Sequence, residues 1–204
     1  MKEMTIETFA QQTASKEPVP GGGSISALAG ALAAALTEMV AGLTIGKKEY
    51  IEVQEEMEKI ISLMQAIRRQ LLEDIQRDSE SFDQYMQALS MPKETKEQKE
   101  KRSKAMQEGL KAAVAVPLSV AQNAVEILPY TKLIVAKGNK TAVTDGLVAG
   151  MMARTAALGA LYNVKINLKS IKEETFVEAV SKEVKKLEEI AVRMEKEIIE
   201  ETDL

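Results

Sequence analysis

Two kinds of segment alternate along this chain of 204 residues. Residues 18–46, 112–125 and 141–164 are rich in Ala, Gly and Val and carry hardly any charge, whereas residues 47–111 and 165–204 combine many Glu and Lys with apolar residues at helical spacing. No segment shows the period of two that is typical of a half-buried strand, so the pattern predicts an all-α protein. Helices that are apolar all round belong inside a bundle, and amphipathic helices pack around them.

Caps, prolines and the spacing of apolar residues place six helices along the chain. Thr5 and Asn139 are the expected N-caps of the first and fifth helices, because both side chains can accept a hydrogen bond from a first-turn N–H group. The sixth helix is expected to start after Ser170 or Glu174. The expected bounds are residues 5–15, 24–46, 50–89, 112–129, 139–162 and about 170–201.

Three features are expected to interrupt the helices. The very polar residues 93–111 should form a solvated loop, and residues 163–168 a short extended connector. Pro117 should kink the fourth helix and Pro129 should stop it. No linker is long enough to separate a second domain, so the sequence predicts a single-domain antiparallel helical bundle over residues 1–204.

Composition narrows the chemistry further. The 27 basic and 31 acidic residues give a net charge of −4, which offers no general electrostatic reason to bind nucleic acid. The chain has no Cys and no His, which excludes thiolate nucleophiles, Ser-His-Asp chemistry and the usual zinc sites. Acid–base catalysis must therefore use Asp, Glu, Lys or Tyr, and no metal site is expected.

Residues 18–46 are apolar enough to be compared with a membrane span, and Glu38 is their only charged residue. Their apolar content is mostly Ala and Gly, which gain little on transfer into a bilayer, so we expect a buried helix and no membrane contact. Glu38 would then be an interior acid or lie at the rim of a cavity. Residues 1–7 lack the apolar core of a signal peptide, which favours a cytoplasmic location.

The glycine-rich turn Gly21-Gly22-Gly23-Ser24 is the first candidate site, because it immediately precedes a helix whose first turn is uncharged. Free backbone N–H groups and the helix dipole attract anions to such an end, and glycine lets a ligand approach the backbone closely. The alternative interpretation is a flexible connector that follows the prolines.

Asp78 is the second candidate, because it interrupts the apolar stripe of the third helix between Ile75 and Phe82. Burying a carboxylate without a partner costs several kcal/mol, so Asp78 either serves a site or forms a structural salt bridge. The neighbouring acids are expected to be solvated; they are Asp74, Glu80 and Asp83.

Asp145 is the third candidate, in an otherwise neutral segment. If the helix starts near Thr144, Asp145 simply complements the helix dipole. If Asn139 is the cap, Asp145 is interior and Arg154 is the nearest ion partner. Lys47 and Lys48 allow a similar choice, since they either suit the C-terminus of the second helix or hold a ligand carboxylate.

Several short motifs, taken together and in this order, resemble one family. They are Pro20–Ser24 before an Ala-rich helix, Asp78 four residues before Phe82, Ala113–Leu118, Gly138-Asn139 followed by Thr144-Asp145, and Asn163-Val164 followed by Ile166–Leu168. They resemble the cyclodeaminase domain of formiminotransferase-cyclodeaminase and its stand-alone bacterial relatives, the methenyltetrahydrofolate cyclohydrolases. The resemblance covers essentially the whole chain. Thr144 departs from the family's Ser but keeps the hydroxyl.

The resemblance implies an all-helical homodimer that binds folate in a cleft near the subunit interface. It implies cyclisation of 5-formiminotetrahydrofolate to 5,10-methenyltetrahydrofolate with release of ammonia, a reaction of histidine degradation. The alternative is hydrolysis of 5,10-methenyltetrahydrofolate to 10-formyltetrahydrofolate. No cofactor is expected beyond the tetrahydrofolate substrate, with or without a polyglutamate tail, and a separate formiminotransferase would supply that substrate.

The resemblance also assigns site residues. Asp145 and Asp78 become the catalytic acid and base, in an order that stays open, and the substrate-binding residues are Gly21, Gly22, Gly23, Ser24, Lys47, Lys48, Asn139, Thr144 and Asn167. Two other classes of function remain as alternatives. A helical interaction protein without catalysis would have both aspartates exposed, or ion-paired far from any pocket. RNA binding through residues 93–111 is disfavoured because that stretch has no aromatic residue to stack on bases.

Overall fold

The computed structural model describes residues 1–203. Within that range the chain forms six α-helices and no strand, which confirms the all-α prediction. Two short 3-10 turns lie at Lys48–Val53 and Lys140–Ala142. The α-helices are α1 (Ile6–Thr13), α2 (Gly22–Thr44), α3 (Gln54–Ser90), α4 (Lys96–Lys137), α5 (Val143–Leu168) and α6 (Glu174–Ile199).

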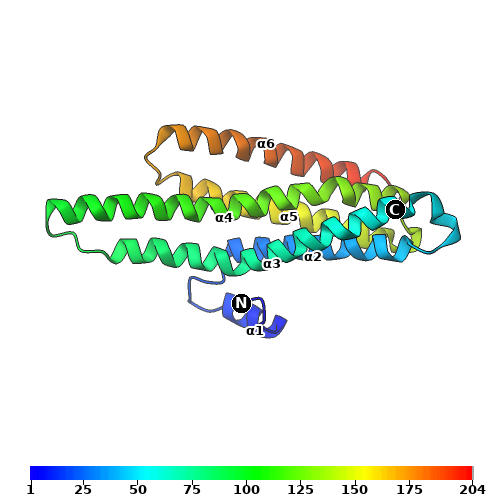
Figure 1. The fold of residues 1–204 in the computed structure, drawn as a ribbon, viewed down its shortest axis with the longest axis horizontal. Helices are drawn as coiled ribbons and strands as arrows, with labels where there is room; N and C mark the ends of the chain where they lie inside the picture. The colour runs from blue at the N-terminus through cyan, green and yellow to red at the C-terminus, as the bar shows by residue number, and fades with distance from the viewer. Residues whose placement is uncertain (204) are drawn as a thin grey trace.

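Helices α2 to α5 run along the long axis of the molecule as an antiparallel bundle (Figure 1). Helix α2 packs between α3 and α5, α4 packs against α3 and α5, and α6 covers α4 and α5. Helix α1 stands apart from the bundle, and the hairpin of α3 and α4 extends beyond the other helices at one end (Figure 1). All six helices contribute side chains to a common hydrophobic core.

Small residues allow α2 and α5 to approach each other closely. A Cβ atom on Gly159 of α5 would lie 2.5 Å from Ser26 Oγ of α2, and one on Gly22 would lie 3.4 Å from the side chain of Asn163. These two pairs run in opposite directions along the sequence, so α2 and α5 are antiparallel. The Ala- and Gly-rich composition of both segments therefore serves close helix packing.

Helices α2, α4 and α5 are long and apolar enough to cross a membrane, as judged by length and composition alone. Of the most apolar stretch in α2, 56% is buried inside the protein, and the share is 44% in α4 and in α5. About half of this apolar sequence is thus used in packing between helices.

Two expectations about the connecting segments are wrong. Most of the stretch 93–111 is helical, because a capping box starts α4 at Lys96. In that capping box Thr95 Oγ1 accepts from the N–H of Gln98 at 3.2 Å, and the Gln98 side chain accepts from the N–H of Thr95 at 3.1 Å. Residues 163–168 are likewise not extended but form the last turns of α5.

Both prolines of α4 lie within the helix, so the expectation that Pro129 ends it is also wrong. Helix α4 passes Pro117 and Pro129 and continues to Lys137, where it is packed against α3, α5, α6 and part of α2. Burial against several neighbours outweighs the hydrogen bond that each proline removes.

The predicted caps are largely confirmed. Thr5 is the N-cap of α1, and its Oγ1 accepts from the N–H of Thr8 at 3.1 Å. Asn139 caps the 3-10 turn that leads into α5, rather than α5 itself, and accepts from the N–H of Thr141 at 3.1 Å.

Candidate active site

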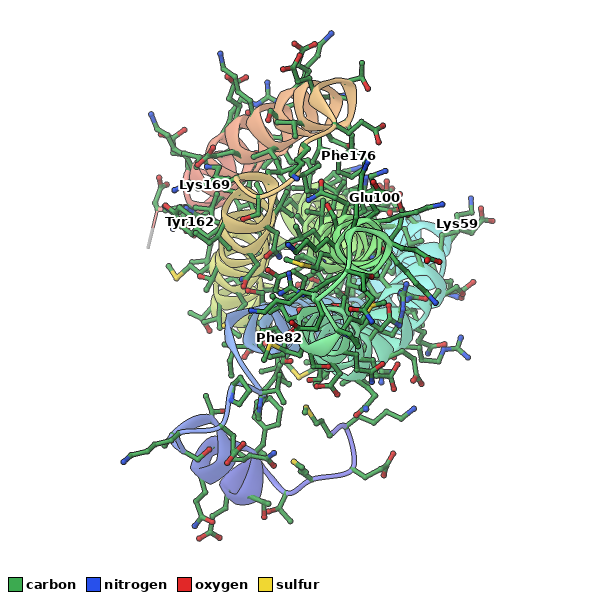
Figure 2. All side chains as sticks on the ribbon, turned by 90° about the vertical axis from the view of Figure 1, so that its left-hand side faces the viewer. Lys59, Phe82, Glu100, Tyr162, Lys169 and Phe176 are labelled. Carbon is green, nitrogen blue, oxygen red and sulfur yellow. The ribbon has the colours of Figure 1, made fainter. Side chains whose placement is uncertain are left out.

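A cleft of about 280 Å³ opens at the end of the bundle where α2 begins. Its walls come from residues 18–21 and from α2, α3, α4 and α5. Figure 2 looks onto this end, with Phe82 beside the segment that leads into α2. Asp78 is the one ionisable acid or base in the lining besides the phenol of Tyr85. The lining residues are Pro18, Val19, Gly21, Gly22, Gly23, Asp78, Ser81, Phe82, Tyr85, Ala113, Asn163, Ile166 and Asn167.

Asp78 projects from α3 toward the first turn of α2. Ser24 Oγ donates to Asp78 Oδ2 at 3.0 Å, and the Ser24 backbone also donates to this carboxylate. Gly21, the N-cap residue of α2, has no side chain that could accept a hydrogen bond from the first turn. Asp78 therefore caps α2 from the neighbouring helix.

The environment of Asp78 changes its acidity. Burial raises the pKa of the Asp78 carboxyl above its ordinary value, because the charged form is poorly solvated in the cleft. The hydrogen bonds from Ser24 act in the opposite direction, and the negative charge of Asp74 raises the pKa further. The net effect is a raised pKa, which suits a group that must donate a proton near neutral pH.

The glycine-rich turn permits this arrangement. A Cβ atom on Gly23 would overlap the carboxylate of Asp78, and one on Gly21 would lie 3.3 Å from the carbonyl oxygen of Pro18. The close approach that the glycines allow is thus, in part, the approach of Asp78 to the backbone of α2.

Two asparagines of α5 complete the far wall of the cleft. Asn167 Nδ2 donates to the carbonyl oxygen of Ala113 at 2.9 Å, and Asn163 Nδ2 donates to that of Gly159 at 2.9 Å. Both amide nitrogens are therefore engaged by backbone, which leaves the two amide oxygens available to accept from a ligand. Asn163 was not among the expected site residues, although it belongs to a motif of the resemblance; Ser81, Phe82 and Tyr85 were also not assigned.

The other expected site residues lie at the opposite end of the bundle. The backbone N–H of Asn139 donates to Thr44 Oγ1 at 2.9 Å, which places Asn139 beside the C-terminus of α2. Asn139 is buried, Asp145 is half-buried in the first turn of α5, and the remaining three are exposed; they are Lys47, Lys48 and Thr144.

Asp145 and Asp78 do not meet within one subunit. Asn163 lines the cleft with Asp78, and Asp145 precedes Asn163 on the same helix. A separation of about 18 residues, at about 1.5 Å per residue, corresponds to roughly 27 Å along α5. The structure therefore brings together Gly21, Gly22, Gly23, Ser24, Asp78 and Asn167, and separates them from Lys47, Lys48, Asn139, Thr144 and Asp145.

The acids around these candidates differ from expectation in two cases. Asp74 is fully buried rather than solvated, whereas Glu80 and Asp83 are exposed as expected. Arg154 pairs with Glu195 of α6 at 3.0 Å and not with Asp145. 

Glu38 is half-buried and is held by neighbours on α3. Arg68 Nε donates to its Oε2 at 3.0 Å and Gln65 Nε2 to its Oε1 at 3.1 Å. This ion pair joins α2 to α3, and it lies outside the cleft that contains Asp78.

Comparison with known proteins adds independent evidence. The family model described as formiminotransferase-cyclodeaminase matches residues 5–186. A methenyltetrahydrofolate cyclohydrolase of Methylorubrum extorquens is 39% identical over 183 residues, which cover 90% of this chain and 88% of that protein. The formimidoyltransferase-cyclodeaminase of Sus scrofa is 33% identical over 89% of this chain, and the match spans 34% of that longer protein.

A solved structure agrees with this assignment. The formiminotetrahydrofolate cyclodeaminase from Thermotoga maritima superposes with a TM-score of 0.89 at 29% identity, over 98% of this chain and 96% of that one. The family match, the sequence relatives and the fold thus coincide over nearly the whole length of the chain. This protein belongs to the formiminotransferase-cyclodeaminase family.

Proposed function

We propose that this protein cyclises 5-formiminotetrahydrofolate to 5,10-methenyltetrahydrofolate with release of ammonia, and that Asp78 transfers the protons. The observation that carries the proposal is the state of Asp78, whose pKa is raised in a cleft that is otherwise nearly free of ionisable groups. The relative from Thermotoga maritima is named for this activity, and its fold matches with a TM-score of 0.89.

The reaction needs two proton transfers and no electron transfer. N10 of the folate attacks the formimino carbon on N5, and the bond between that carbon and the leaving nitrogen then breaks to release ammonia. The formimino group reacts as the protonated amidinium, so N10 must lose one proton and the leaving nitrogen must gain one more to depart as ammonia. Protonated Asp78 can donate to the leaving nitrogen and recover a proton from N10, which regenerates the acid. Since both reacting groups belong to one molecule, holding that molecule folded provides much of the rate enhancement.

The cleft suits part of such a ligand. Phe82 and Tyr85 offer aromatic faces on which a pterin ring can pack, and the amide oxygens of Asn163 and Asn167 can accept from its N–H groups. Sites for small molecules commonly measure about 300 to 1,000 Å³. The cleft of one subunit, at about 280 Å³, lies just below that range.

We infer that a second copy of the chain completes the site. Large apolar side chains are exposed along one face formed by the neighbouring helices α2 and α5, called here the α2–α5 face. Its residues are Ile25, Leu32, Met39, Leu43, Val148, Met151, Tyr162 and Ile166. Tyr162 is 63% exposed and projects from α5 on the side of the bundle opposite Lys59 (Figure 2). Several large apolar side chains exposed on two neighbouring helices favour an interface at this face.

A symmetric dimer through this face would unite the two groups of site residues. Helices α2 and α5 are antiparallel and run most of the length of the bundle, so a two-fold axis through the middle of the α2–α5 face exchanges its ends. Asp145 and Thr144 of one subunit would then approach the cleft of the other. Asp145 would stabilise the cationic one-carbon unit by charge, and Lys47 and Lys48 would bind the carboxylates of the folate tail.

Hydrolysis of 5,10-methenyltetrahydrofolate is the second candidate. It is favoured by the 39% identity to a methenyltetrahydrofolate cyclohydrolase, since the match covers 88% of that protein. Water would add to the same carbon, and the C–N5 bond would break to leave 10-formyltetrahydrofolate and one proton. The same carboxyl group can assist this reaction by moving the proton between water and N5.

Assays of the purified protein on both substrates distinguish the two candidates. Cyclodeaminase activity would release ammonia from 5-formiminotetrahydrofolate as methenyl absorbance appears. A flat trace there, together with rapid hydrolysis of 5,10-methenyltetrahydrofolate, would establish the second candidate instead. If the first holds, we expect a formiminotransferase to supply the substrate, since the name of the longer relatives combines both activities.

A further inference from the structure

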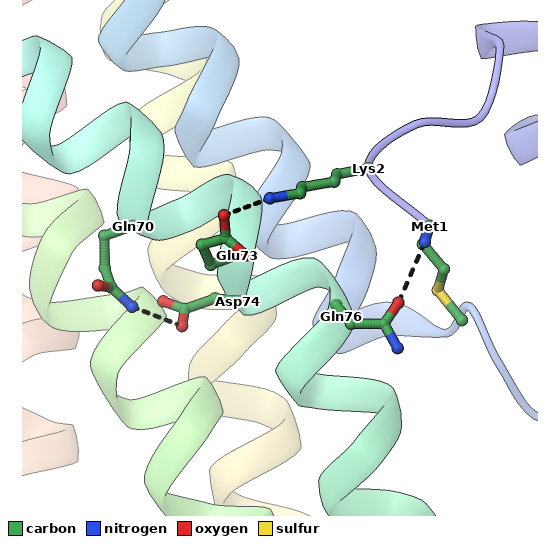
Figure 3. Close-up of polar contacts among 6 residues, drawn as sticks. All are labelled: Met1, Lys2, Gln70, Glu73, Asp74 and Gln76. Atoms are coloured by element: carbon green, nitrogen blue, oxygen red, sulfur yellow. Dashed lines mark hydrogen bonds and ion pairs between the residues drawn. The ribbon is translucent and has the colours of Figure 1, made fainter.

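Asp74 is a buried carboxylate to which the proposed reaction assigns no role. Its side chain is 0% exposed, and its Oδ1 accepts from Gln70 Nε2 at 3.0 Å and from Arg77 Nη1 at 2.5 Å. Within residues 1–203 its other oxygen, Oδ2, is buried and has no hydrogen-bond partner. Figure 3 shows Gln70 reaching Asp74 along α3, away from the contacts that Glu73 and Gln76 make with the N-terminal segment.

The contacts of Asp74 do not connect α3 to another helix, so they do not explain why this carboxylate is buried. Gln70 and Arg77 both belong to α3, so these hydrogen bonds join Asp74 to no other helix. Other ion pairs in this protein do connect helices, as Glu38 does with Arg68. Burying a carboxylate with one oxygen unpaired is unfavourable, and a residue that tolerates this cost usually serves a site.

Asp74 lies one helical turn before Asp78 on α3, and side chains at this spacing are neighbours. The wall of the cleft that faces Asp78 from residues 18–21, α2, α4 and α5 carries no charged side chain. On α3 itself, Tyr85 is the other titratable residue of the lining. Arg77 is not among the residues that line the cleft, and it pairs with Asp74. Asp74 is therefore the charged neighbour that acts most directly on Asp78 within the described subunit.

We propose that Asp74 is a positioning residue for proton transfer, whose buried negative charge favours the protonated form of Asp78, the form that donates to the leaving nitrogen. This inference rests on the proposed function of Asp78. Asp74 does not line the cleft, so it acts through Asp78 and not on the substrate. Arg77 moderates the effect, because its positive charge partly compensates that of Asp74.

The test follows the ionisation of Asp78 directly. The chain contains five aspartates, so carboxyl-labelled aspartate gives few NMR signals, and Asp78→Asn identifies the one that belongs to Asp78. Asp74→Asn should move the titration midpoint of Asp78 to lower pH, because a repelling charge is removed. Arg77→Gln should move it to higher pH. Glu73→Gln is the matched control, since it removes an exposed carboxylate one residue away and should leave the midpoint unchanged.

The pH dependence of turnover should shift in the same direction as the titration midpoint of Asp78. In Asp74→Asn the pH profile should shift to lower pH, with activity at pH 8 falling roughly threefold relative to the wild type and changing less at pH 6. An unchanged midpoint in a folded Asp74→Asn variant, or an equal shift in Glu73→Gln, would overturn the proposal. If Asp74→Asn does not fold, Arg77→Gln decides, because an unchanged midpoint there overturns it as well. If the midpoints shift as expected but the wild-type protein is inactive on both folate substrates, the proposed function is refuted and the role of Asp74 is not.

Discussion

Asn167 supplies the hydrogen bond that Pro117 denies to Ala113. In a regular helix the N–H group of residue 117 would donate to the carbonyl of residue 113, and proline has no N–H group. Asn167 Nδ2 of α5 donates to that carbonyl oxygen at 2.9 Å. The contact fastens the C-terminal turns of α5 to α4 at the wall of the cleft, so Asn167 has a structural task in addition to any contact with a ligand.

A double-mutant cycle separates these two tasks. Asn167→Ala should lower the free energy of unfolding by about 1 kcal/mol, because the carbonyl of Ala113 loses its donor. In a Pro117→Ala background the helix provides its own N–H donor, so the same substitution should cost clearly less. Urea denaturation measures both values, and equal costs in the two backgrounds would contradict this account. A rise in KM that persists in the Pro117→Ala background would indicate direct binding of substrate by Asn167.

Gly23→Ala should impair activity by displacing Asp78. The added methyl group would occupy the space of the carboxylate, so Asp78 must rotate away from Ser24 or α2 must shift. We expect turnover to fall at least about tenfold, because displacing a catalytic group by about 1 Å commonly lowers the rate by more than that. Gly42→Ala is the matched control on the same helix, because a Cβ atom there meets nothing within 4 Å. That variant should keep full activity and gain up to about 1 kcal/mol of stability.

Asp78→Asn should abolish turnover and also change how stability depends on pH. The folded protein raises the pKa of Asp78, so the unfolded chain ionises first as pH rises above about 3.9. Between the two pKa values the folded state binds more protons than the unfolded state. The free energy of unfolding of the wild type therefore falls as pH increases. The difference in thermal stability, Asp78→Asn minus wild type, should therefore be more positive at pH 8 than at pH 4. Asp83→Asn, at an exposed position, should show no such trend; a larger gain at pH 4 would contradict the raised pKa.

The sequence predicts a helix well where the spacing of its own apolar residues is enough to define it. The stripe from Met57 to Leu89 predicted α3 nearly to its observed end at Ser90. The sequence alone does not predict the full length of α4, because packing against neighbouring helices is what keeps it continuous through Pro117 and Pro129. Its true start was visible in principle, because Thr95 and Gln98 have the spacing of a capping box.

The candidate site was predictable in its parts but not in its assembly. Asp78 stood out because it breaks an apolar stripe, and the structure places it against Gly23 and Ser24. The expectation that Asp74 is solvated is wrong because α3 is buried on more than one face. A second series at intervals of seven residues is also buried: Ile67, Asp74, Ser81 and Ala88. The separation of Asp145 from Asp78 could not be read from spacing, because it follows from the antiparallel course of α2 and α5.

Leu32→Glu should dissociate the proposed dimer. Leu32 lies in the middle of the α2–α5 face and is 47% exposed in the single subunit. A charge at this position is therefore unfavourable only if another molecule covers it. Sedimentation velocity should show a dimer for the wild type and a monomer for the variant, with activity reduced at least about tenfold. Val192→Glu is the control, since Val192 is 45% exposed but lies on α6. A wild type that is monomeric and sediments with lipid vesicles would instead identify this face as a membrane contact.

Mixing two inactive variants tests whether each site combines residues of two subunits. Asp78→Asn and Asp145→Asn should each be inactive as homodimers, because every site lacks one carboxyl group. In a mixed dimer, the cleft of the Asp145→Asn subunit keeps Asp78 and receives an intact Asp145 from the other subunit, so one of its two sites is complete. With random exchange about half of the dimers are mixed, and the recovered activity should approach about a quarter of the wild-type value. Two variants of the same residue, Asp78→Asn and Asp78→Ala, provide the control and should recover nothing when mixed. Failure of the first pair to complement, under conditions where labelled subunits are seen to exchange, would confine each site to one chain and would leave Asp145 about 27 Å from the chemistry.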